Sequence, residues 1–187
     1  MTGSMTALRP TRLLALGCLL VVFAEPALAG CSDFAQPGVN WRRCLQDGQD
    51  LRGADLTGAN LNDASFKRAD LSEADLTGVD ARRAKFVSTL MQDTVLDGAN
   101  LVRADLTNAE MEGASLRETD LTMAKLFRVD LRNADLTGAR LDGSDLLNAQ
   151  LGGATWVDGV TVCAENSVGQ CHRAARQPAL SDVEPSG

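Results

Sequence analysis

The chain repeats with a period of five residues from Gln49 to Asp158, without an insertion or a deletion. Each quintet follows the pattern A-(D/N)-L-x-x, as in Ala54–Gly58, and 22 quintets follow one another. A period of five matches neither the 3.6-residue turn of an α-helix nor the two-residue alternation of a β-strand. It predicts a chain that turns a corner in every quintet, as in a solenoid of stacked coils.

The apolar residue at the centre of each quintet, position i, is expected to point into the solenoid together with the small residue at i−2. Position i is mostly Leu and position i−2 is mostly Ala, which lets neighbouring backbones approach closely. Glycine is frequent at i+2, where a turn with positive φ is expected. All five prolines lie outside residues 38–177, as required if every coil donates hydrogen bonds to the next.

Through this motif, over about 110 residues, the chain resembles the pentapeptide-repeat proteins. The resemblance implies an all-β fold, a right-handed quadrilateral β-helix in which four quintets make one square coil. Residues 49–158 then form about five and a half coils, a rod roughly 26 Å long at ~4.8 Å per coil. Residues 20 apart are expected to stack on one face, Phe66 on Phe86 and Met91 on Met111.

Residues 1–29 are interpreted as a bacterial signal peptide and not as part of the fold. Arg9 and Arg12 precede an apolar run from Leu13 to Ala24, and Ala27-Leu28-Ala29 is a typical cleavage site. The run is short for a transmembrane helix. A periplasmic or secreted location follows. The alternative is a lipoprotein, because Leu28-Ala29-Gly30-Cys31 also resembles a lipobox, and Cys31 would then anchor the chain to a membrane.

Four cysteines remain after Gly30, and they lie in two pairs near the two ends of the repeat. Cys31 with Cys44, and Cys163 with Cys171, predict two local disulfides in an oxidising compartment. We expect an N-terminal cap at 30–48, a C-terminal cap at 159–172 and a disordered tail at 173–187. Trp41 and Trp156 are expected to lie over the two ends of the lumen, because an open solenoid end exposes core and unpaired backbone.

The chain from Gly30 carries 16 Lys and Arg against 24 Asp and Glu. The excess acid lies at i−1, and the pattern predicts stacked columns such as Asp50 with Asp70 and Asp55 with Asp75. Some cytoplasmic pentapeptide-repeat proteins mimic DNA and bind gyrase, so an acidic inhibitor of a DNA-binding enzyme is the alternative function. The export signal and the interleaved arginines disfavour it. Weak Ca²⁺ binding by the columns is left open, although the sequence contains no dedicated calcium loop.

One outward column ends in large apolar residues and predicts a surface for a protein partner or a homodimer. The candidate partner patch comprises Val87, Met123, Phe127 and Leu147.

No catalytic motif, phosphate loop or metal-ligand motif occurs, and the single histidine is His172. We therefore expect no enzyme activity, no cofactor and no nucleic-acid partner. The sequence favours a non-enzymatic scaffold of the bacterial periplasm or envelope that serves a structural or protein-binding role.

Overall fold

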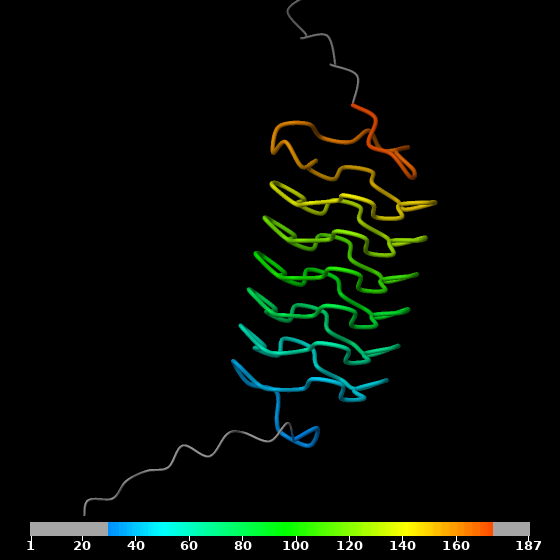
Figure 1. Cartoon of the computed structure of the whole chain (residues 1–187). Helices are drawn as coiled ribbons and strands as arrows, with labels where there is room; N and C mark the ends of the chain where they lie inside the picture. The colour runs from blue at the N-terminus through cyan, green and yellow to red at the C-terminus, as the bar shows by residue number, and fades with distance from the viewer. Residues whose placement is uncertain (1–29, 174–187) are drawn as a thin grey trace, which may run out of the picture.

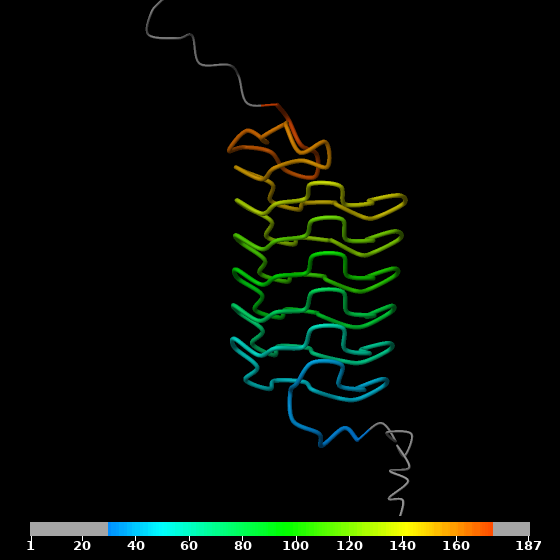
Figure 2. The ribbon, with the colours of Figure 1, turned by 90° about the vertical axis from the view of Figure 1, so that its left-hand side faces the viewer.

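The structure, a computed structural model, describes residues 30–173. These residues form a rod of flat, stacked coils, with the N-terminal coil at one end and the C-terminal segment at the other (Figure 1). The view turned by 90° shows the same stack edge-on, with its coils evenly spaced (Figure 2). Residues 30–173 contain no α-helix, and their β-structure consists of isolated bridges, one residue at a time. The protein is therefore a β-helical solenoid.

Every coil takes 20 residues, because parallel bridges join each residue at position i−1 to the residue 20 further on. The rows run from Asn40↔Asn60 to Asp135↔Thr155. On each side, two adjacent coils donate backbone hydrogen bonds to each other. The N–H of Leu71 donates to the carbonyl of Leu90 at 2.8 Å, and the N–H of Leu90 donates to Ala69 at 3.0 Å. With a turn in every quintet, each coil has four sides.

The turns place the i+2 residue in the left-handed region of φ, as predicted from the glycines at this position. Gly58 has φ 64° and Gly98 has φ 65°. Fourteen residues other than glycine adopt the same conformation, among them Arg83 and Glu118. The stacking between coils therefore imposes one turn shape on every quintet up to the one that ends at Gly153, whichever residue is present.

The lumen of the inner coils is filled by the i and i−2 side chains, as the pattern predicts. Leu61, Leu101 and Met111 are fully buried. Phe66 and Phe86 stack in adjacent coils with ring centroids 5.3 Å apart and planes 7° from parallel, which confirms the expected contact. Three threonines at i−2 are also buried, and each hydroxyl donates to a carbonyl of the preceding coil, as Thr94 does to Leu71 at 2.8 Å.

The coils begin before the expected boundary at residue 49. Gly38 already donates its N–H to Thr57, and Asn40 and Leu45 bridge to the coil above them. Residues 38–157 span six coils at 20 residues each, so most of the expected N-terminal cap is a coil. The repeat was not recognisable there because Cys44 and Gln46 take the inward places of Ala and Leu.

The C-terminal segment reverses direction and covers part of the last coil. Its bridges are antiparallel, Thr155↔Val162, Gln150↔Val168 and Cys163↔Arg173. Thus Arg173, expected at the start of a disordered tail, takes part in the cap. The remainder of that tail, 174–187, and the expected signal peptide, 1–29, lie outside the described residues.

The C-terminal end of the lumen is only partly closed by the described chain. Among residues 30–173, no carbonyl accepts the N–H groups of Leu141, Gly143, Leu146 and Asn148. Leu141 and Leu146 are only half-buried, unlike their equivalents in the inner coils. The cap therefore pairs with the later part of the last coil and leaves the earlier part without a backbone partner in the described chain.

Within residues 30–173, there is no helix of the length and apolarity needed to cross a bilayer.

Candidate functional site: the outer sides of the solenoid

The interior of the rod offers no room for a substrate, because its side chains fill it from coil to coil. In residues 30–173, no cluster of three or more His, Cys, Asp or Glu side chains is arranged to hold a metal ion. Any binding by this part of the chain must therefore occur on the outer sides or at the ends.

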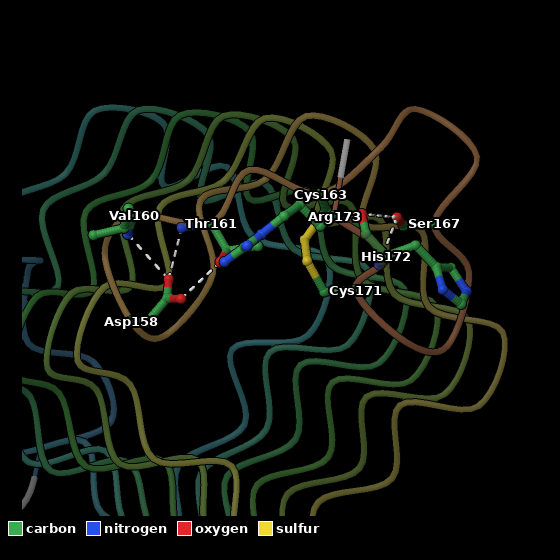
Figure 3. The surroundings of a disulfide bond; sticks show 8 residues. All are labelled: Asp158, Val160, Thr161, Cys163, Ser167, Cys171, His172 and Arg173. Atoms are coloured by element: carbon green, nitrogen blue, oxygen red, sulfur yellow. Dashed lines mark hydrogen bonds between the residues drawn. A yellow bond between two sulfur atoms is a disulfide. The ribbon is translucent and has the colours of Figure 1, made fainter. Parts of the chain in front are cut away.

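Each end of the rod carries a disulfide. Cys31 is bonded to Cys44 in the first coil, and Cys163 is bonded to Cys171 within the C-terminal segment. The pairs are those expected from the sequence, and the N-terminal one occupies the thiol that a lipid anchor would need. Figure 3 shows the C-terminal disulfide beside the turn that begins at Asp158.

The two tryptophans occupy different environments. Trp41 is 2% exposed, packs against Phe66 with ring centroids 6.2 Å apart, and donates its indole N–H to the carbonyl of Asp33 at 3.3 Å. Trp156 is only half-buried and lines a hollow of about 420 Å³ with Leu141 and Arg140. Trp41 thus lies inside the first coil beneath the N-terminal segment, whereas Trp156 leaves its end of the lumen partly open.

The candidate partner patch is divided between two corners of the coil. Val87, Phe127 and Leu147 occupy one corner in successive or alternate coils, while Met123 lies on the preceding corner. Leu147 is 60% exposed and Met123 is 54% exposed. Phe127 is half-buried, and the guanidinium of Arg128 lies 4.9 Å from its ring centre. Leu147 and Met123 are therefore the most accessible members.

The acidic columns form as predicted: bridges join Asp50 to Asp70 and Asp55 to Asp75. Many of these carboxylates are held by neighbouring groups. The side chain of Arg52 donates two hydrogen bonds to Asp50, at 2.9 and 2.7 Å, and lowers the pKa of that carboxyl to about 2. Hydrogen bonds from the hydroxyl and N–H of Thr57 lower the pKa of Asp55. The carboxylates of Asp50 and Asp55 thus remain ionised in mildly acidic solution.

A feature that the sequence analysis missed is an arginine-lined hollow of about 530 Å³ on the corner that begins at Arg42. Arg82, Arg83 and Arg103 reach it from later coils. The signal was present in the sequence as arginines 20 and 40 residues apart, at positions that stack on one another.

The family model for pentapeptide repeats matches this chain in eight copies, over residues 50–86, 84–122 and 124–155. Together with the 20-residue coil, this match shows that the chain belongs to the pentapeptide-repeat family. No curated protein matches the chain significantly.

The solved structure of QnrB1 shows the same fold. A trypsin-treated variant of QnrB1, a plasmid-mediated fluoroquinolone resistance protein, is 24% identical, with a TM-score of 0.61 over 64% of this chain and 61% of that one. HetL from Nostoc sp. strain PCC 7120, involved in heterocyst differentiation regulation, is 28% identical, with a TM-score of 0.46 over 73% and 65%. The chain thus spans less than two thirds of the length of these neighbours.

Proposed function

We propose that the protein is a non-enzymatic scaffold, exported to the bacterial periplasm or envelope, that binds a protein partner on its outer surface. The observation that carries the proposal is the filled lumen of the inner coils, because the described chain then offers its chemistry on the outer sides and at the ends. Solvated side chains on a flat β-surface are suited to recognition more than to catalysis, which requires converging groups with shifted pKa values.

Export is supported by the two disulfides, because such bonds persist in oxidising compartments and are rare in the cytosol. The apolar run and cleavage pattern in residues 1–29 agree with it. A bond between Cys31 and Cys44 favours a soluble exported protein over a lipoprotein anchored through Cys31.

The proposed contact region for the partner is the patch of Val87, Met123, Phe127 and Leu147. Exposed apolar side chains beside arginines are typical of protein-binding surfaces. A homodimer would use the same patch.

Because the fold is similar to that of QnrB1, we retain one alternative function, that of an acidic inhibitor that imitates DNA. Such an inhibitor of a cytoplasmic enzyme such as gyrase would have to remain in the cytoplasm. Cell location therefore separates the two functions.

The test is fractionation of bacteria that express the full chain, followed by intact-mass measurement with and without reduction. We expect a soluble periplasmic chain that begins at Gly30 and gains four hydrogens on reduction, two for each disulfide. Cross-linking should capture a partner that Leu147→Asp releases. A full-length cytoplasmic chain would contradict export, and an acylated chain beginning at Cys31 would establish the lipoprotein.

A further inference from the structure

Charge is divided unequally among the four sides of the rod. One side, called the basic side, comprises residues 42–48 and the segments that stack on them at intervals of 20 residues, up to 142–148. It carries ten Lys and Arg against five Asp and Glu. The rest of the coils, within residues 40–158, carry four Lys and Arg against fifteen Asp and Glu. A chain with net charge −7 thus has one side of positive charge.

The basic residues of the two regions differ in their partners. On the acidic sides, Arg52, Arg117 and Arg132 are all paired with carboxylates, at 2.7, 3.0 and 2.7 Å. On the basic side, only Arg82, Arg83 and Lys125 have carboxylate partners among residues 30–173. Seven others have none in the described chain: Arg42, Arg43, Lys67, Arg68, Lys85, Arg103 and Arg128.

In the arginine-lined hollow at one edge of the basic side, an arginine already binds a carboxylate of the chain itself. Arg83 donates two hydrogen bonds to Asp63, both at 2.7 Å, in the fork geometry that favours carboxylate and phosphate groups. Arg42 and Arg103 line the same hollow without such a partner among the described residues. Carboxylates from another molecule could pair with these two arginines as Asp63 pairs with Arg83.

The exposed apolar residues of the coils lie on this side as well. Leu45 is 77% exposed and belongs to the central bridge row of the basic side, and Met123 and Leu147 lie on its two corners. Arginine with exposed apolar side chains is a composition enriched in protein interfaces. A nucleic-acid-binding domain is usually basic as a whole, whereas this chain has a pI near 4.7.

A lipid surface fits the basic side less well. Leu45 and Leu147 are exposed on this side, but the tryptophan and tyrosine side chains that anchor proteins at a bilayer interface are missing from it. The chain has no tyrosine, Trp41 is buried in the first coil, and Trp156 lies at the C-terminal end of the rod. A hollow with fork-shaped donors also suits separate carboxylates better than a plane of headgroups.

We propose that the partner of this scaffold is an acidic protein segment, bound along the basic side with its carboxylates on Arg42, Arg43 and Arg103. The inference rests on the proposed function, because it names the chemical class of the partner. The apolar patch provides the adjoining contact at the C-terminal half of the same side.

The experiment measures binding of the full chain to a fluorescein-labelled dodecapeptide of alternating Glu and Ser, by anisotropy at low ionic strength. The variant Arg42→Gln/Arg43→Gln/Arg103→Gln removes three of the unpaired donors and is expected to bind roughly tenfold more weakly. The matched control Arg52→Gln/Arg117→Gln/Arg132→Gln changes the net charge equally on the acidic sides and is expected to bind as the wild type does. Arg103→Gln alone should give an intermediate loss.

The wild type is expected to bind this peptide more tightly than a Gln-Ser peptide, duplex DNA or phosphatidylglycerol vesicles. Equal weakening in the two triple variants would overturn the proposal, because net charge alone would then explain binding. So would absence of peptide binding, or tighter binding to DNA or vesicles. The proposed location is tested independently of the proposed partner. A chain that stays in the cytoplasm yet binds the peptide would refute export but would still support an acidic partner on the basic side.

Discussion

At the scale of single residues, the turn at i+2 dominates the local energetics. The sequence marked this position by its glycines, and the structure gives every i+2 residue of the coils a positive φ, including Arg103 and Glu118. Sequence patterns did not predict the left-handed conformation of these larger residues. It follows from the hydrogen bonds between coils, which hold each quintet to the shape of the one below it.

Gly98→Ala is expected to destabilise the protein by about 1 kcal/mol, since a Cβ disfavours the left-handed conformation. Gly98 has φ +65°, and an added Cβ would meet no atom within 4 Å, so the effect isolates the backbone. Denaturant unfolding measures it. Ser88→Ala is the control, because Ser88 already carries a Cβ at φ 55°. Equal stability of the two variants would show that the turn imposes no such strain.

Another residue with a defined local role is Asp158, which organises the turn into the C-terminal cap (Figure 3). Its carboxylate accepts the N–H groups of Val160 and Thr161, at 3.0 and 2.7 Å, and the hydroxyl of Thr161 at 2.7 Å. These bonds, with the Thr161 hydroxyl contributing most, lower its pKa from 3.8 to about 2. The ionised form is thus favoured by the folded state.

Asp158→Ala is expected to lower the Tm at neutral pH more than Asp142→Ala, which removes the same charge from an exposed carboxylate 3.9 Å from Arg140. Because the folded pKa of Asp158 is depressed, its stabilisation is complete above about pH 4. It is lost as the pH falls toward about 2. Thermal unfolding across this range should show the difference between the two variants shrinking. A difference that stays constant with pH would exclude ionisation of Asp158 as its source.

At the scale of the coil, the sequence predicted which residues point inward because the period is strict. It gave no inward positions before residue 49, where polar residues replace apolar ones and a cap was expected. Gln46 takes an inward place in the first coil, and its side-chain amide donates to the carbonyl of Cys31 at 3.1 Å. A polar residue is acceptable there because the N-terminal segment supplies its partner. No repeat pattern contains that information, since the partner lies outside the repeat.

The C-terminal segment was predicted as a cap with a disulfide, but its path was not. Its antiparallel bridges depend on how Asp158 and Gly159 turn the chain, and the pattern of quintets stops at that point. The half-exposed Trp156, and the N–H groups near Leu141 that have no carbonyl partner among residues 30–173, are the consequence.

At the scale of the whole molecule, the sequence indicated an acidic rod, and the structure divides that rod into acidic sides and a basic side. The basic side was missed because the charged residues were counted by their position in the quintet and not by the side of the coil on which they lie. Counting all i−1 residues together combines Asp50 and Asp70 with Lys85 and Lys125, which lie on different sides. Grouping residues at intervals of 20 separates them, so the basic side was predictable from the coil length alone. The arginine forks were not, because they depend on side-chain positions.

The 20-residue register has a consequence for how such a chain can change in length. Duplicating residues 81–100 adds one coil, lengthens the rod by ~4.8 Å and keeps every later residue on its own side. Duplicating only residues 96–100 adds one quintet and rotates everything after it by a quarter turn. Small-angle scattering should detect the longer rod in the first case. In the second, Met123 and Leu147 would leave the side that carries Arg42 and Arg83. Adding whole coils therefore changes only the length of the rod, whereas adding a single quintet changes the side on which all later residues lie.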